Sequence, residues 1–223
     1  MKNKELLKLS CQSCQMRARE IMGKNFLGTK ETISRLYSSL MEDEEILEGL
    51  AKIPFKEKTL ELYKKSHILV AVYPGTFNDI LHKIIPFDMK SAFIGQTGLN
   101  KAGWYLVRKT PVSGSFQKTW DEQLNLLHND EEVPIRYIVA FTIICYYLTH
   151  GEKLFHKVYA RCSDRTERGL SEEKLRGSHG VIGDFDDCVM LWGNRRYPWI
   201  GNFLIKDEDW ETDLGLASMI RRV

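Results

Sequence analysis

Residues 130–151 read DEEVPIRYIVAFTIICYYLTHG, and this stretch predicts the helix around which the rest of the chain folds. Acidic residues precede it, a proline stands near its first turn and Gly151 follows its last residue, so three helix-boundary signals agree. From Tyr137 to Leu148 every residue except Thr142 is apolar. A helix that is apolar nearly all round is buried. We therefore expect this helix at the centre of the fold.

Shorter helices and two strands are expected before the central helix. Apolar residues repeat on one helical face within residues 4–22, and again after Thr29, which we expect to cap a second helix. Thr119 and Glu122 have the spacing of a reciprocal helix cap. Further short helices are predicted at EDEEILEGL (42–50) and KEKTLELYKK (56–65), and strands at HILVAVYP (67–74) and GWYLVRK (103–109).

Beyond the central helix the pattern changes to the alternation of strands. Four short strands are predicted, at LFHKVYARC (154–162), GVIGDF (180–185), CVMLW (188–192) and WIGNFLI (199–205). Helices followed by a strand-rich end indicate an α+β fold, in which the central helix packs on a mostly antiparallel C-terminal sheet. We expect a helical N-terminal region (1–52) and an α+β domain (53–223), or alternatively one domain over residues 1–223.

Composition excludes several classes of protein. Hydrophobic residues make up 43% and charged residues 28% of the 223, which is usual for a globular protein and not for a disordered one. A net charge of +2 does not indicate a phosphate-rich partner. No apolar run approaches the roughly 18 residues of a membrane span, and the N-terminus does not have the pattern of a secretion signal. Five scattered cysteines do not form a secreted disulfide framework, so we expect the cytoplasm of a bacterium or of a phage-infected cell.

Three segments carry a resemblance to other proteins: IPFKEKTLELYKKSHILVAVYP (53–74), the block from Gly103 to Asp164, and VIGDFDD (181–187). Together they cover residues 53–74 and roughly 103–201. In order and spacing they are similar to a group of bacterial hypothetical proteins with no established activity, cofactor or catalytic residue. The resemblance implies one folded unit and transfers no function.

A metal-assisted hydrolase, such as a nuclease, is one interpretation of the segment HGVIGDFDDC (179–188). In a strand Asp184 and Asp186 fall on one face, and paired carboxylates bind divalent cations. His179 and Asp164 are the candidates to complete the catalytic site. The alternative, which we favour, is that DFDD forms a tight turn between two strands. No metal ligand set is complete, and no cofactor is indicated.

A single-stranded nucleic acid groove is a second interpretation of the same region. Arg195, Arg196, Tyr197 and Trp199 combine positive charge with surfaces on which bases stack. We expect Arg161, Arg165 and Arg168 to extend such a surface. The acidic residues of DEDWETD (207–213) oppose it, and the interpretation that we favour is a hairpin whose arginines are solvated.

The remaining reactive residues favour structural roles. Cys11 and Cys14 form a C-x-x-C pair on an apolar helix face, where cysteine packs as a small hydrophobe, although they could also supply two metal ligands. We expect satisfied structural histidines at His67, His150 and His156, and an acid–base pair of Glu152 with His156 has no motif behind it. No G-x-S-x-G elbow, P-loop or dinucleotide fingerprint is present. The sequence thus predicts a non-catalytic binding or accessory protein with a protein partner, and nucleic acid as the alternative partner.

Overall fold

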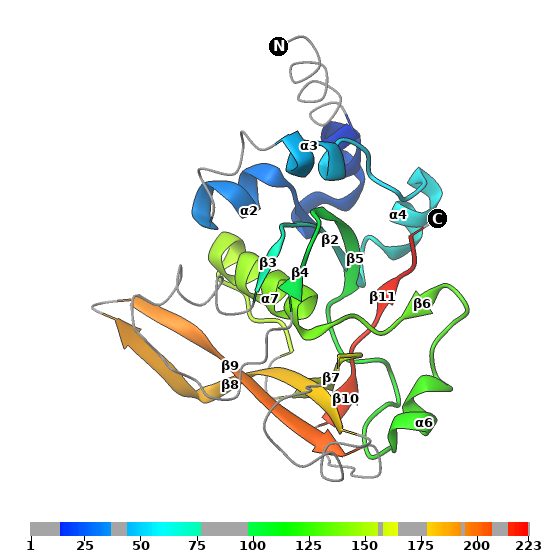
Figure 1. The fold of residues 1–223 in the computed structure, drawn as a ribbon, viewed down its shortest axis with the longest axis vertical. Helices are drawn as coiled ribbons and strands as arrows, with labels where there is room; N and C mark the ends of the chain where they lie inside the picture. The colour runs from blue at the N-terminus through cyan, green and yellow to red at the C-terminus, as the bar shows by residue number, and fades with distance from the viewer. Residues whose placement is uncertain are drawn as a thin grey trace.

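The computed structural model describes residues 14–36, 44–76, 98–155, 158–164, 178–192, 195–206 and 214–222, and for residues 33–36, 178–192 and 195–206 it describes the backbone alone. Helices and strands are combined, and the sheets contain both parallel and antiparallel pairs (Figure 1), so the α+β class is confirmed. Within the described ranges no helix has the length and apolar character needed to cross a membrane.

The helices confirm most of the periodic segments. Residues 14–22 are helical and continue into a 3-10 turn. Thr29 is the first residue of its helix rather than the cap, because its hydroxyl bonds to Gln15 and the helical hydrogen bonds begin at Gly28. The elements are η1 (Gly23–Asn25), α2 (Thr29–Leu36), α3 (Glu44–Leu50), α4 (Glu57–Tyr63), α6 (Trp120–Leu124) and α7 (Arg136–His150).

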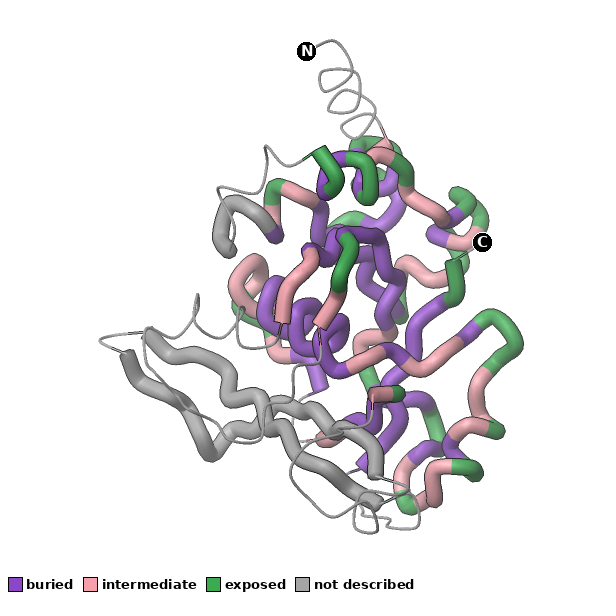
Figure 2. Tube along the Cα trace, in the orientation of Figure 1, coloured by how far each residue is buried: buried purple, intermediate pink, exposed green. Residues whose placement is uncertain are grey.

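The predicted central helix, α7, is buried as expected. Every residue from Arg136 to Tyr146 is buried, and Figure 2 shows the purple core along it. Its last turn ends at Gly151, whose left-handed φ of 70° suits a residue without a Cβ and whose N–H donates to the Tyr147 carbonyl at 2.7 Å. The Tyr137 hydroxyl donates to the Tyr73 carbonyl at 2.9 Å, so this buried polar group is satisfied.

A five-stranded mixed sheet carries the main core. Its order is β1 (Phe26–Leu27), β2 (His67–Val72), β5 (Gly103–Arg108), β11 (Met219–Ile220) and β6 (Glu131–Glu132), with β1 parallel to β2 and the other neighbours antiparallel. All of β2 and most of β5 are buried. Two short strands, β3 (Gly75–Thr76) and β4 (Gly98–Leu99), pair separately.

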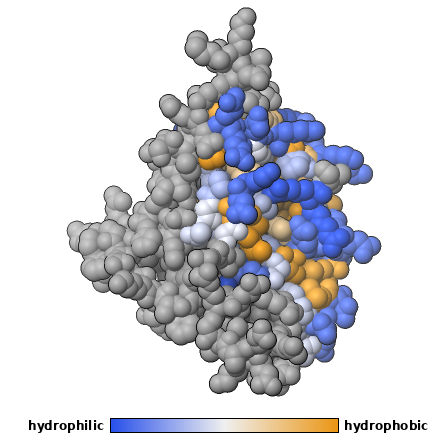
Figure 3. Space-filling model, in the orientation of Figure 1, coloured by the Kyte–Doolittle hydropathy of each residue, from blue (hydrophilic) through white to orange (hydrophobic). Residues whose placement is uncertain are grey.

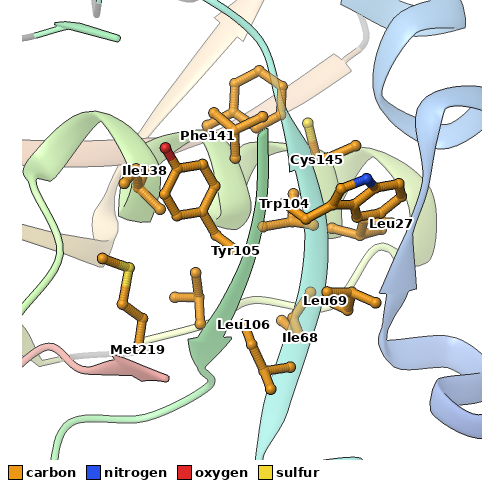
Figure 4. Packing of buried hydrophobic residues seen from close by; sticks show 14 of the residues in the cluster. Leu27, Ile68, Leu69, Trp104, Tyr105, Leu106, Ile138, Phe141, Cys145 and Met219 are labelled. Carbon is orange, nitrogen blue, oxygen red and sulfur yellow. The ribbon is translucent and has the colours of Figure 1, made fainter. Parts of the chain in front are cut away.

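Helices pack on both faces of this sheet. Successive strand residues alternate between faces, so Tyr105 and Trp104 face opposite ways. Tyr105 points toward Ile138 and Phe141 of α7 (Figure 4). On the other side, the Trp104 ring lies 5.7 Å from the Phe26 ring and its Nε1–H donates to the Leu50 carbonyl of α3 at 3.1 Å.

A four-stranded sheet contains the C-terminal strands, in the order β10 (Leu214–Leu216), β7 (Tyr159–Arg161), β8 (Ser178–Trp192) and β9 (Arg195–Lys206). The strand predicted over residues 154–162 is limited to β7, since Leu154 and Phe155 lie in a bend before it. The strands predicted at 180–185 and 188–192 are one continuous strand, β8.

The C-terminal segment connects the two sheets, which the sequence pattern did not predict. β10 pairs with β7, β11 pairs with β5 and β6, and Ala217 and Ser218 are the only residues between them. The Ala217 N–H donates to the Arg161 carbonyl, and the Ser218 carbonyl accepts from the Arg108 N–H, both at 3.0 Å. Residue 52 is where the predicted helical N-terminal region ends. Buried side chains from residues before and after this position belong to one hydrophobic cluster.

Candidate functional site

The residues predicted for chemistry lie mostly on the β8–β9 hairpin, which we call the ribbon (Ser178–Trp192 with Arg195–Lys206). The backbone register pairs His179 with Ile205 and Asp184 with Ile200. His179 and Asp184 are thus five residues apart on one strand, which at about 3.4 Å per residue is roughly 17 Å. Arg195 and Arg196 lie at the far end and pair with Trp192 and Leu191. The side chains of all these residues are outside the described part, so their catalytic and binding roles stay predictions.

The favoured interpretation of DFDD as a turn between two strands is wrong. Asp184 to Asp187 lie inside β8, at a shift in register between the pairs Phe185–Trp199 and Met190–Tyr197. Four residues of β8 there lie opposite one residue of β9, Pro198. Proline has no N–H to donate to a ladder, and prolines in sheets occur at edges and bulges, which accounts for an irregularity at this point.

The ribbon extends well beyond the sheet that supports it. β7 pairs with β8 only from Val181 to Gly183. From Asp184 onward, β8 pairs among the described strands with β9 alone, and β9 is the outer strand of its sheet. In Figure 1 the ribbon runs from the region of β7 and β10 toward the left of the view. Among the described helices, α7 contacts both of its strands.

The base of the ribbon is anchored by a buried polar cluster. Arg161 and Gln123 are fully buried, and the Arg161 guanidinium contacts the Gln123 Oε1 at 3.5 Å. The Gln123 amide donates to the Ser115 carbonyl at 2.7 Å and to the Leu214 carbonyl at 3.3 Å, which joins α6 to β10. Arg161 therefore does not extend a surface for nucleic acid, contrary to expectation, while Arg165 and Arg168 lie outside the described residues.

Asp164, a candidate for the hydrolytic site, binds the first turn of α7. Its Oδ1 accepts the Arg136 backbone N–H at 2.7 Å, and its Oδ2 forms an ion pair with the Arg136 guanidinium. The two side chains are only 3% and 8% exposed. A carboxylate at a helix N-terminus is stabilised there by the helix dipole and by the unpaired N–H groups. Asp164 therefore stabilises the start of α7 and neutralises the buried Arg136.

A second polar cluster, at the end of the five-stranded sheet, was not found from the sequence. It gathers His67 of β2, Arg108 of β5 and Glu131 of β6, and Ser218 next to β11. Arg108 and Ser218 bond to the Glu131 Oε1 at 3.2 Å and 3.0 Å. Glu131 is 1% exposed. Four distant segments supply these residues, so no local spacing could have indicated the cluster.

His67 is the least satisfied member of this cluster. It is 1% exposed, its Nδ1 lies 2.9 Å from the Ser66 hydroxyl, and its Nε2 has no partner among the described residues. Burial first, and then the Arg108 charge, lowers the pKa of His67 from 6.5 to about 4. A histidine whose pKa is lowered in this way is a weak base, so this cluster does not resemble an activated catalytic site.

The described cysteines are buried or half-buried thiols. The Cys14 Sγ donates to the Ala51 carbonyl at 3.3 Å, and burial raises the pKa of its thiol. Cys145 and Cys162 are buried, and burial likewise raises the pKa of Cys162. Over the described ranges, no three His, Cys, Asp or Glu residues gather as a metal site would require. Cys11 lies outside those ranges.

An acid–base pair of Glu152 with His156 would involve a residue outside the described part, His156. Glu152 itself is occupied by other groups. Lys24 Nζ lies 3.1 Å from its carboxylate, and the Tyr146 hydroxyl lies 3.3 Å from its Oε2. These contacts connect η1 to the end of α7 and serve the fold.

Comparisons with known proteins give no assignment: no family model, no curated protein and no solved structure matches this chain.

Proposed function

We propose that this chain is a non-catalytic binding protein whose ribbon contacts a protein partner. The observation that carries the proposal is the extent of the ribbon: β8 and β9 pair at eleven positions, of which β7 supports three. From Asp184 onward the described pairing of β8 is with β9 alone, as in a two-stranded hairpin. Isolated hairpins are marginally stable, so contact with another surface would stabilise it.

The composition of the distal ribbon favours a protein surface. Val189 to Trp192 are four consecutive apolar residues, and β9 adds Tyr197, Trp199 and Ile200. Because strand positions alternate, a consecutive apolar run supplies both faces of the ribbon. Because α7 contacts both strands of the ribbon, it would cover one of these faces. The second apolar face is then the proposed contact surface, since aromatic residues and methionine are enriched in protein interfaces.

The outer edge of β9 offers a second means of contact. An edge strand presents unpaired N–H and C=O groups, to which an extended segment of a partner can add as a further strand. Pro198 interrupts that row, so two shorter stretches, before and after it, would be available. We place the chain in the cytoplasm, in keeping with five scattered cysteines that do not form a secreted disulfide framework.

The test compares opposite faces of the ribbon with a matched site elsewhere. Met190→Asp and Leu191→Asp alter opposite faces, and Leu62→Asp alters an apolar side chain of α4 that is 71% exposed. We expect the wild type and Leu62→Asp to recover the same stoichiometric partner from source cells. One ribbon variant, folded by circular dichroism, should lose it. Equal recovery by all four proteins would contradict the proposal.

Single-stranded nucleic acid is the second candidate, because Arg195 and Arg196 directly follow residues 193–194 at the ribbon's far end. Tyr197 and Trp199 would supply stacking surfaces. Asp184 and Asp186 on the same ribbon weaken the positive field, and the described surface in Figure 3 mixes hydrophilic and apolar areas. Salt-sensitive binding of a labelled oligonucleotide, lost when both arginines become alanine, would support this candidate. Absence of binding at low salt would exclude it.

A metal-assisted hydrolase using Asp184, Asp186, His179 and Asp164 remains a prediction of lower rank. The Asp164 carboxylate is bound to Arg136, and the register separates His179 from Asp184. Nuclease activity that requires a divalent cation and is lost in Asp184→Asn would reverse this ranking.

A further inference from the structure

The cluster around His67 has a feature that neither packing nor the proposed binding function uses. The His67 side chain is buried, and its ring nitrogen Nε2 has no hydrogen-bond partner among the described residues. The Arg108 Nε in the same cluster also finds none. Buried polar atoms in proteins are nearly always satisfied, so each exception calls for an explanation.

Charged and polar groups face His67 from every element that packs against it. From α4, the Tyr63 ring meets the imidazole edge-on at 4.7 Å. From β5, Arg108 is the cross-strand neighbour of His67. From the β6 region, the carboxylates of Asp130 and Glu131 act on it, the first accepting the Tyr63 hydroxyl at 2.6 Å. A proton on His67 would therefore place a second buried positive charge close to Arg108.

The same groups hold the C-terminal strand. Ser218, immediately before β11, donates its hydroxyl to Glu131 and accepts the Arg108 N–H through its carbonyl. Arg221, just after β11, donates its N–H to the Asp130 carbonyl at 2.8 Å. The strand is thus fixed at both ends to residues that interact with His67.

We propose that His67 is a proton-operated latch for the C-terminal strand β11: with a neutral imidazole the strand is closed, and protonation releases it. β11 and β6 are two-residue strands, whereas β2 and β5 pair over six positions in the core. Short strands held by few hydrogen bonds open at lower free energy than a central ladder. Opening β6 and β11 would admit water to the imidazolium while β2 and β5 stay paired.

Release of β11 has a structural consequence for the second sheet. Only Ala217 and Ser218 separate β11 from β10, which pairs with β7 beside the ribbon. A released β11 removes the connection between the sheets, so protonation of His67 would loosen the support of the ribbon. This inference does not rest on the proposed partner.

Hydrogen exchange of the full-length chain, followed by mass spectrometry and corrected for intrinsic rates, tests the latch. With a pKa of about 4 closed and 6.5 open, opening of residues 214–222 should increase on the order of 30-fold between about pH 7.5 and about pH 5. Residues 67–72 should remain much better protected than residues 214–222 at both pH values. His67→Gln should abolish the increase, and His128→Gln, at an exposed histidine, should preserve it.

Three results would overturn the latch: unchanged exchange in residues 214–222, equal protection of β2 and residues 214–222 at about pH 5, or an increase that survives in His67→Gln. If His67→Gln does not fold, the pH dependence of exchange in the wild-type protein tests the latch. When one histidine takes up a proton on opening, the opening constant increases about tenfold for each unit by which the pH falls below about 6.5. A rise that begins only below about pH 4.5 would indicate carboxylates and would refute the proposal.

Discussion

Replacing Asp164 with alanine should strongly destabilise the fold. Asp164 accepts the backbone N–H of Arg136 at the start of α7 and neutralises its guanidinium, and the two side chains are 8% and 3% exposed. Without the carboxylate, a buried cation and an N–H at the helix start lose this partner. The hydrolase interpretation makes a different prediction, since removal of a catalytic acid would abolish activity and leave stability nearly unchanged.

The magnitude follows from burial. Removing one partner of a buried ion pair costs about 3–5 kcal/mol, because the remaining charge is left uncompensated. A domain of ordinary stability has about 5–15 kcal/mol, so the variant would lose a large fraction of it. Asp164→Asn should cost less than Asp164→Ala, because its amide oxygen can still accept the Arg136 N–H.

Urea unfolding followed by circular dichroism measures this loss. Glu57→Gln is the matched control, because Glu57 pairs with Arg17 at the surface, where both side chains are more than half exposed. Exposed pairs contribute about 0–1 kcal/mol. A double variant, Arg136→Met with Asp164→Leu, should recover much of the stability, since apolar replacement of a whole buried pair is often neutral. A loss below about 1 kcal/mol in Asp164→Ala would show that this ion pair does not stabilise the fold as a buried pair does.

Further predictions concern protonation, a buried amide and thiol reactivity. Because the pKa of His67 is about 4 in the folded state and 6.5 in the unfolded chain, its contribution to stability is complete above pH 6.5 and is lost as the pH falls toward 4, by about 3 kcal/mol. Urea midpoints across this range should show that loss in the wild type, and a parallel loss in His67→Gln would contradict it. Gln123→Leu should cost about 1–3 kcal/mol, because two buried carbonyls and a guanidinium lose a partner, and an unchanged urea midpoint would disprove this. Mapped alkylation of the native protein should modify half-buried Cys14 before fully buried Cys162, and the reverse order would show that the core near β7 opens more readily than the N-terminal helix.

The core could be predicted because its signals are local. α7 combines a long apolar run with boundary residues at both ends, and β2 and β5 are short apolar runs between polar turns. The cap at α6 was also readable, since Glu122 accepts the Thr119 N–H at 2.8 Å, three residues away in sequence. Each of these elements depends on neighbours within a few residues.

The remaining elements depend on partners far along the chain. β11 has two residues and exists because β5 and β6 lie on its two sides, more than eighty residues earlier. β8 continues through Asp186 and Asp187, at the shift in register, because the residues on both sides of them pair with β9, and this pairing overrides the turn preference of aspartate. The cluster of His67, Arg108 and Glu131 likewise forms only after the sheet is assembled. Sequence periodicity contains none of this information.

Site-specific photocrosslinking in source cells tests the proposed role of the ribbon most directly. A benzophenone amino acid would replace Leu191 or Met190 on β8, and Leu62 on α4 in a control protein. We expect a covalent adduct with one protein of defined mass from a ribbon position and none from position 62. Crosslinking from position 62 alone, or the absence of any adduct from both ribbon positions, would contradict it.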